Sequence, residues 1–264
     1  MISYNHLGCN GRIGNQMFQY AALLGIAEKH GYQFCIPSSN FNDPSCDHQL
    51  FEVFELKNLK KENIKKLYNV NQIKESGFHF DYNLFETCPH NVDIFGYFQT
   101  EKYFLHAIDK IREDFTFKEN ILNDVNDYRN QIKSSEVISL HIRRGDYLKY
   151  PWHGCCSLEY YEKALSLIDD NLPVIIFSDD PEWCLQQKLF ESDRFYVSEH
   201  NCNSFDMCLM TLCDYHIIAN SSFSWWGAWL SNSNVIYAPQ RWFGPPLSEQ
   251  NNTSDLIPDN WIKL

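Results

Sequence analysis

The second half of the chain alternates short apolar runs with longer segments whose apolar residues recur at helical spacing. The apolar runs predict buried strands at 137–140, 173–177, 195–197, 216–219 and 235–237. The segments between them predict helices at 157–170, 181–190, 204–215 and 224–230. Strands that alternate with helices in this way favour right-handed βαβ units around a parallel sheet. Residues 134–240 are therefore expected to form a Rossmann-like domain.

The first half has a less regular pattern. A glycine-rich turn at 8–14 precedes a helix predicted over 15–30, and strands are predicted at 32–36 and 93–98. A further helix is predicted at 101–111, and the apolar spacing in 120–135 is compatible with a linking helix. We place the domain boundary in that link, which gives domains 1–133 and 134–264. It stays open whether the final segment packs back on the first domain.

Composition limits the classes of protein that fit. The 264 residues are 44% apolar and carry a net charge of −12, which supplies a large core and disfavours a protein that binds nucleic-acid phosphates. No apolar stretch is long enough to span a bilayer, and the first residues show no signal-peptide pattern, so we expect a cytoplasmic protein. The ten cysteines lack metal-binding spacing and are expected to be reduced core residues.

Polar clusters follow the predicted strands of the second half. These clusters are 141–147, 178–180, 198–200 and 220–222. Since ligands of parallel sheets bind outside the carboxyl ends of the strands, the clusters are expected to meet at one rim. His141 and Arg143 share a strand face, and arginine pairs well with phosphate or carboxylate. The alternative is an internal ion pair of Arg143 or Arg144 with Asp146.

Two helix starts offer further anion sites. Gly14 and Asn15 follow Gly11 in a turn that opens the first helix, where free amides and the helix dipole favour an anion. An ordinary tight turn explains the pattern equally well, and it matches neither a dinucleotide-binding motif nor a P-loop. Ser221 and Ser222 precede the helix at 224–230, where hydroxyls and amides at a helix N-terminus likewise favour an anion.

The pattern of acidic residues disfavours a metal site. The chain has no Asp-x-Asp motif, and the adjacent Asp179 and Asp180 have side chains that diverge on an extended backbone. We therefore expect no metal and no other cofactor, with phosphate charge neutralised by arginine and helix ends. Asp206 either caps the helix at 204–215 or accepts hydrogen bonds from a guanine base.

Several motifs together resemble a known family. The runs 11–21 (GRIGNQMFQYA), 141–147 (HIRRGDY), 176–183 (IFSDDPEW), 205–207 (FDM) and 220–230 (NSSFSWWGAWL) resemble the α-1,2-fucosyltransferases of glycosyltransferase family 11. The resemblance covers most of the chain in the same order and leaves 37–90 and 245–264 unassigned. It implies an α/β protein of the GT-B class, with two facing Rossmann-like domains, a cleft between them, and GDP-β-L-fucose held mainly by the second domain.

The resemblance also implies roles for single residues. It places Arg143 on the β-phosphate of the donor, His141 and Asp206 on guanine, and Ser221 and Ser222 on phosphate. Gly14 and Asn15 are placed near the phosphate and the sugar. Ser178 and Asp179, from the strand-end clusters, complete the residues expected to bind the donor.

The implied reaction is an inverting transfer of L-fucose to the 2-hydroxyl of a terminal β-galactoside. Arg143 and Asn15 are the expected catalytic residues, together with Asp146, which serves either as the base for the acceptor hydroxyl or to orient an arginine. Tyr147, Tyr150 and Trp152 are the candidates for acceptor binding. The alternatives are transfer from another GDP-sugar or to another linkage, and a non-catalytic module that binds a nucleotide sugar or glycan. Trp225, Trp226 and Trp229 are expected in the core.

Overall fold

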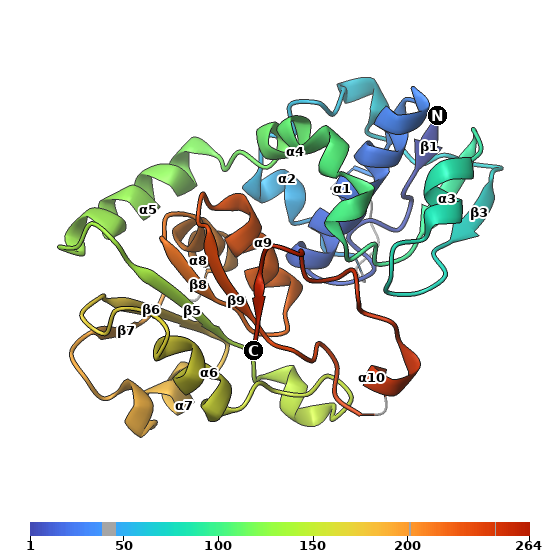
Figure 1. Cartoon of the computed structure of the whole chain (residues 1–264). Coiled ribbons are helices and arrows are strands. Elements are labelled where there is room, and N and C mark those ends of the chain that lie inside the picture. The colour runs from blue at the N-terminus through green and yellow to red at the C-terminus, as the bar shows by residue number, and fades with distance from the viewer. Residues whose placement is uncertain (39–45, 201, 246) are drawn as a thin grey trace. The chain divides into compact units, whose positions relative to one another are not determined.

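The structure is a computed structural model that describes residues 1–38, 46–200, 202–245 and 247–264. The chain divides into two compact units (Figure 1). Unit 1 comprises Met1–Lys118 and Asn252–Pro258, and unit 2 comprises Glu119–Asn251 and Asp259–Leu264. The division therefore falls before the linking helix, whereas the predicted boundary, 133/134, falls after it. That helix, α5 (Glu119–Gln131), packs against a helix of unit 2 because its buried Ile121 and Val125 need an apolar partner.

Unit 1 is built on a four-stranded parallel sheet. The strands β1 (Ile2–Ser3), β2 (Phe34–Cys35), β3 (Asn71–Lys74) and β4 (Val92–Phe95) lie in the order β2-β1-β4-β3. The helices are α1 (Ile13–His30), α2 (Leu50–Val53), α3 (Tyr82–Thr87) and α4 (Ile108–Asp114). Most of α1 is buried, which explains its nearly continuous apolar sequence.

A disulfide joins Cys9 and Cys46 in unit 1. The prediction that all ten cysteines are reduced is therefore wrong for this pair, which the sequence separates by 37 residues and the fold brings together. Cys35, Cys184 and Cys208 are free and buried, as predicted. Cys155 and Cys202 are exposed, so the prediction of core residues is wrong for these two. Because disulfides persist mainly in oxidising compartments, the Cys9–Cys46 bond does not support the expected cytoplasmic location.

Unit 2 contains a six-stranded parallel sheet. Its strands are β5 (Ile138–Ile142), β6 (Val174–Ser178), β7 (Phe195–Val197), β8 (Tyr215–Ile217), β9 (Val235–Ala238) and β10 (Ile262–Lys263), in the order β10-β9-β8-β5-β6-β7. The helices are α6 (Leu158–Leu165), α7 (Pro181–Leu185), α8 (Asn203–Thr211), α9 (Ser222–Leu230) and α10 (Leu247–Gln250). This order is that of the doubly wound Rossmann fold, as the sequence predicts.

The strand order fixes where unit 2 can hold a ligand. From β5 the chain continues through β6 to β7 on one side of the sheet, and it then crosses to β8 and continues to β9 on the other side. In Figure 1, α6 and α7 lie on one face of the sheet, and α8 and α9 lie on the other. The topological switch point is thus the crevice at the carboxyl ends of β5 and β8, where ligands of this fold bind.

The final residues serve both units. The Asp255 carboxylate accepts hydrogen bonds from the Phe80 backbone N–H (3.0 Å) and from Lys102 Nζ (2.5 Å), all within unit 1. The chain then returns to unit 2, where β10 pairs with β9. The final segment thus contributes to both units rather than to one.

Some predicted elements are broken or shorter. In place of the helix predicted at 101–111, two 3-10 turns at Glu101–Tyr103 and Leu105–Ala107 precede α4. The strand predicted at 93–98 ends at Phe95, because Gly96 begins a turn in which Phe98 has a positive φ of 53°. Trp225, Trp226 and Trp229 are buried, as predicted.

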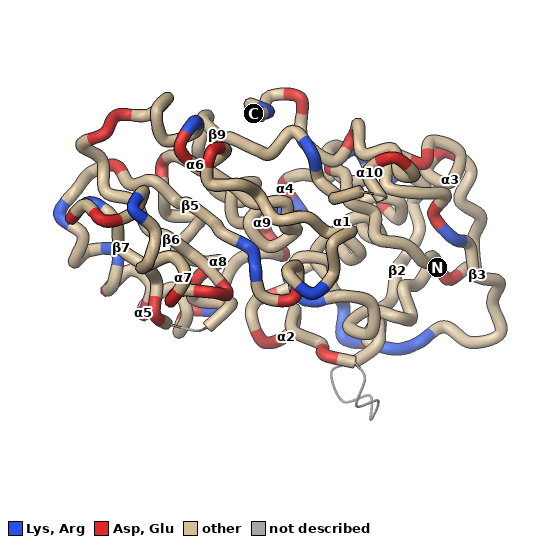
Figure 2. The backbone as a smooth tube through the Cα atoms, turned by 90° about the horizontal axis from the view of Figure 1, so that it is seen from below, with Lys and Arg blue, Asp and Glu red and all other residues tan. Residues whose placement is uncertain are grey.

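No helix within the described residues is long and apolar enough to cross a bilayer. Acidic and basic positions are interspersed along the backbone (Figure 2).

Candidate active site at the switch point

Arg143 lies just past the carboxyl end of β5, at the switch point. The register pairs Ile142 with Ser178, which brings Arg143 beside Asp179 on the neighbouring strand end. Arg143 Nη1 lies 3.0 Å from Asp179 Oδ2, and Nη2 donates to Asp146 Oδ1 at 2.5 Å. The internal ion pair weighed for Arg143 is therefore present, with two carboxylates rather than one. The guanidinium side chain stays 16% exposed, so its planar edge can still reach a ligand.

Gly145 makes this close approach of two strands possible. A Cβ atom at position 145 would lie 2.4 Å from Asp179 Oδ2 and 3.0 Å from Asp179 Cγ. No side chain therefore fits there while Asp179 holds Arg143. This contact gives the Arg-Arg-Gly-Asp sequence a steric explanation that the sequence alone does not reveal.

Arg144 turns toward the other aspartate of the pair. Its Nε donates to Asp180 Oδ2 at 3.1 Å, and its guanidinium lies 3.8 Å from the centre of the Trp183 ring. The Arg144 backbone N–H donates to Asp179 Oδ1 at 2.8 Å. Arg144 thus does form an ion pair, but the predicted partner, Asp146, is wrong and the partner is Asp180. The two aspartates do diverge, one to each arginine.

His141 is a buried residue of β5 with one ring nitrogen available for a hydrogen bond. It is 5% exposed, and among the described residues its Nδ1 has no hydrogen-bond partner. Burial, and then the Arg143 cation, lower the pKa of His141 to about 3, so the ring is neutral in ordinary buffers. A neutral ring nitrogen is suited to a hydrogen bond with a ligand base rather than to an ion pair.

The N-terminus of α9 borders the same crevice. Ser221 caps this helix, its Oγ accepting from the Phe223 backbone N–H at 3.3 Å, and Ser222 is the first helical residue. The Phe223 ring lies 5.6 Å from the ring of His141, which connects the carboxyl ends of β5 and β8. The helix dipole at Ser222 favours an anion near Arg143's end of the sheet.

Asp206 lies on the first turn of α8 and does not cap it. The N-cap position is Cys202, so the capping alternative is wrong. Asp206 Oδ1 accepts a hydrogen bond from Ser198 Oγ at 2.7 Å, and burial raises the pKa of its carboxyl despite that bond and the nearby His200. Ser198 follows β7, so this carboxylate also faces the carboxyl edge of the sheet. Ser178, at the end of β6, accepts from the Asp180 backbone N–H.

The three acceptor candidates differ in their surroundings. Tyr147 is packed: its ring stacks on His153 with centroids 4.5 Å apart, and its hydroxyl donates to the Asn220 carbonyl at 3.1 Å. Burial raises the pKa of Tyr147 to about 12. Tyr150 and Trp152 are 44% and 42% exposed and pack on each other. Only Tyr150 and Trp152 thus present substantial free ring surface.

Gly14 and Asn15 lie in unit 1, on the first turn of α1. Asn15 Oδ1 accepts from Gln99 Nε2 at 2.8 Å, which fixes the amide orientation. Gly11 has φ +97°, and a Cβ there would lie 2.3 Å from Asn15 Nδ2, so glycine is required for both backbone and space. The turn therefore presents the Asn15 side chain in a defined position.

The amides of this turn are largely engaged within the chain. The Ile13 N–H donates to Gln49 Oε1 at 2.9 Å, and those of Asn15 and Gln16 donate to the Arg12 carbonyl. These contacts weaken the anion-site interpretation of the turn. Its contribution rests instead on the Asn15 side chain.

Sequence reasoning missed the residues that hold these groups in place. Gln49 and Gln99 are distant in sequence from the α1 turn that they contact. The available signal for Gln99 was its position just after a predicted strand, at the same sheet edge. Within the described residues no group of three or more His, Cys, Asp or Glu side chains is arranged to hold a metal ion.

Solved structures share this architecture. POFUT1 in complex with GDP matches 88% of this chain and 94% of its own, with TM-score 0.57 and 12% identity. The fucosyltransferase NodZ from Bradyrhizobium matches 87% of this chain and 93% of its own, with TM-score 0.55 and 12% identity. Likenesses at this level of identity establish the fold, and the fold is that of the GT-B glycosyltransferases.

The chain belongs to glycosyl transferase family 11, whose family model matches residues 2–264. Escherichia coli relatives include an alpha-1,2-colitosyltransferase, 39% identical over 66% of this chain and 63% of its own length, and the O-antigen biosynthesis glycosyltransferase WbnK, 30% identical over 97% and 98%. A rat galactoside alpha-(1,2)-fucosyltransferase 2 is 26% identical over 86% of this chain and 67% of its own. The chain thus spans somewhat less than two thirds of the colitosyltransferase.

Proposed function

We propose that this family 11 enzyme transfers L-fucose from GDP-β-L-fucose to the 2-hydroxyl of a terminal β-galactoside, with inversion at C1. The observation that carries the proposal is Arg143 at the switch point, half-enclosed by carboxylates beside the N-terminus of α9. The relatives with fucosyltransferase names and the resemblance in five ordered motifs support the choice of sugar.

In the proposed reaction the bond between fucose C1 and the β-phosphate oxygen breaks, and a bond from the acceptor 2-oxygen to C1 forms on the opposite face. The electron pair leaves with GDP, so negative charge grows on the phosphate. Arg143 and the dipole of α9 would stabilise this charge more in the transition state than in the ground state. Loss of Arg143 should lower the rate by about 10²- to 10³-fold.

Donor recognition in the proposal uses the remaining switch-point groups. The neutral His141 Nδ1 and the Asp206 carboxylate are suited to the hydrogen-bonding edge of guanine. Ser222 would contact phosphate at the helix start. Asp179 and Asp146 hold Arg143 in place, and we infer that a bound diphosphate meets the part of the guanidinium that stays exposed.

Asp146 has two candidate roles, general base for the acceptor hydroxyl and orientation of Arg143. Its contact with Arg143 supports the orienting role over that of general base, so we expect Asp146→Asn to weaken GDP binding together with transfer. Transfer lost at unchanged GDP affinity would instead assign the proton to Asp146. GDP affinity by calorimetry and transfer rates from the same preparation separate the two roles.

The test of the function is release of GDP from GDP-fucose with lactose or N-acetyllactosamine as acceptor, followed by analysis of the product linkage. The proposal fails if no galactoside accelerates GDP release. The colitosyltransferase relative makes colitose an alternative donor sugar, so the assay is repeated with GDP-colitose and with GDP-mannose in place of GDP-fucose. Faster transfer from either would replace fucose as the assigned sugar.

A further inference from the structure

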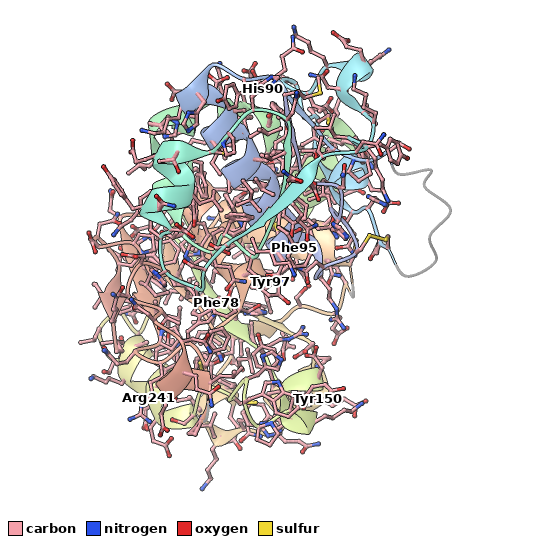
Figure 3. The ribbon with its side chains drawn as sticks, turned by 90° about the vertical axis from the view of Figure 1, so that its right-hand side faces the viewer. Phe78, His90, Phe95, Tyr97, Tyr150 and Arg241 are labelled. Atoms are coloured by element: carbon pink, nitrogen blue, oxygen red, sulfur yellow. A yellow bond between two sulfur atoms is a disulfide. The ribbon has the colours of Figure 1, made fainter. Side chains whose placement is uncertain are left out.

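Aromatic side chains gather at the carboxyl edge of the unit 1 sheet. Phe78 follows β3, Phe95 is the last residue of β4, and Tyr97 lies two residues further on. The rings of Phe78 and Tyr97 stack with centroids 5.6 Å apart and an interplanar angle of 14°. All three side chains are half-buried, and Figure 3 shows them in a row on one face of this unit. We call Phe78 and Tyr97 the aromatic pair.

The half-buried Glu75 carboxylate holds the turn that carries Tyr97. Glu75 Oε2 accepts the backbone N–H groups of Tyr97 (2.9 Å) and Phe98 (2.8 Å), and Oε1 accepts the Tyr103 hydroxyl (3.0 Å). A Cβ at Gly96 would lie 2.6 Å from Glu75 Oε2, so the turn closes tightly on the carboxylate. The backbone at Tyr97 is therefore held in place before any ligand arrives, and Phe78 stacks on its ring, which lowers the entropic cost of binding.

The same turn also contacts Asn15, which the resemblance to family 11 places near the sugar. Gln99, two residues after Tyr97, donates to Asn15 Oδ1. The turn held by Glu75 thus presents the Tyr97 ring and also orients the Asn15 amide. Both groups lie at the carboxyl edge of one sheet, where ligands of α/β folds bind.

We propose that the aromatic pair binds the galactose residue of the acceptor, and that Glu75 is the positioning residue for this surface. The assignment rests on the proposed function. A neutral hexose offers one face of C–H groups, which packs on an aromatic ring. Tyr150 and Trp152 of unit 2 were the candidates from sequence, so the proposal adds a surface on unit 1.

The experiment measures initial rates against acceptor concentration at saturating GDP-fucose, with GDP affinity determined in parallel. Tyr97→Ala should raise the acceptor KM about tenfold and leave the GDP Kd unchanged, since stacking is worth about a factor of ten. Tyr97→Phe keeps the ring and should stay close to the wild type. The control is Tyr82→Ala, because Tyr82 is an exposed tyrosine of the same unit on α3.

Glu75→Gln tests the positioning role. It should raise the acceptor KM without changing GDP affinity, because the amide NH2 group must face either the two N–H groups of the turn or the Tyr103 hydroxyl, and all three donate to the carboxylate. A parallel loss of GDP affinity would indicate general misfolding and overturn the role. Should Tyr97→Ala fail to fold, Tyr97→Leu retains the apolar volume and should show the same rise in KM.

An unchanged acceptor KM in Tyr97→Ala and Tyr97→Leu overturns the proposal. Failure of the function itself is recognised separately, because the wild type would then transfer fucose to no galactoside. Saturation-transfer NMR with a methyl β-galactoside then judges the surface alone. Binding to the wild type that Tyr97→Ala abolishes supports the proposal, and absence of binding to the wild type refutes it.

Discussion

Replacing Gly145 by alanine should disable the donor site without touching a charged residue. The new Cβ would lie 2.4 Å from Asp179 Oδ2, so this carboxylate must move. Its movement breaks the 3.0 Å contact to Arg143 and the 2.8 Å bond from the Arg144 backbone N–H. A hydrogen bond to a charged group contributes about 1.5–3 kcal/mol, and because both contacts are partly exposed we take about 3 kcal/mol for the two.

This free energy corresponds to a loss of about 100-fold in kcat/KM for the donor. The assay is a double-mutant cycle of Gly145→Ala, Asp179→Ala and the double variant, each with transfer rates and GDP affinity. In the Asp179→Ala background the added methyl meets only Cβ of residue 179, at an ordinary 3.7 Å, so Gly145→Ala should have no further effect there. Additive losses, or wild-type activity of Gly145→Ala, would refute the steric reasoning.

Three further predictions concern pH, the disulfide and metal. Burial raises the pKa of Glu75 to about 7 despite hydrogen bonds from Phe98, Tyr103 and Tyr97, so between pH 4.5 and 7 the folded protein keeps a proton that the unfolded chain loses. The free energy of unfolding should therefore fall by up to about 3 kcal/mol over this pH range. Urea titrations at several pH values should show this fall in the wild type and not in Glu75→Gln. Replacing Cys9 and Cys46 by serine should lower the free energy of unfolding by about 2–4 kcal/mol, and a reductant should then have no further effect on the Tm. Transfer rates should be equal with and without EDTA; loss of activity that Mg²⁺ or Mn²⁺ restores would show that a metal takes part.

Most of the sheet of unit 2 could be predicted because its central strands are buried on both faces, whereas the exposed edge strand β10 was not predicted. Strands such as β5 and β6 then appear as continuous apolar runs, separated by segments of helical length. In unit 1, β1 has only two residues and β3 is mostly exposed, so neither leaves a hydrophobic pattern. Their positions depend on pairing with β4, which is a contact between distant residues.

The candidate site shows the same division. Residues at the strand ends could be found because topology brings every such end of a parallel sheet to one edge. The pairing of individual carboxylates with individual arginines could not be predicted, since the contact of Arg143 with Asp179 depends on the register of β5 against β6. Glu75 and Gln99 act through the folded turn, and no local pattern distinguishes them from ordinary polar residues.

The path of the last residues has a consequence for how the protein is made. Asn252–Pro258 complete unit 1, and Asp259–Leu264 supply the edge strand β10 of unit 2. During synthesis both units must therefore remain incomplete until residues 252–264 have left the ribosome. Until then the edge of β9 is unpaired, and Phe80 and Lys102 lack the Asp255 carboxylate. The nascent chain is thus exposed to misassembly for longer than its two-unit architecture would suggest.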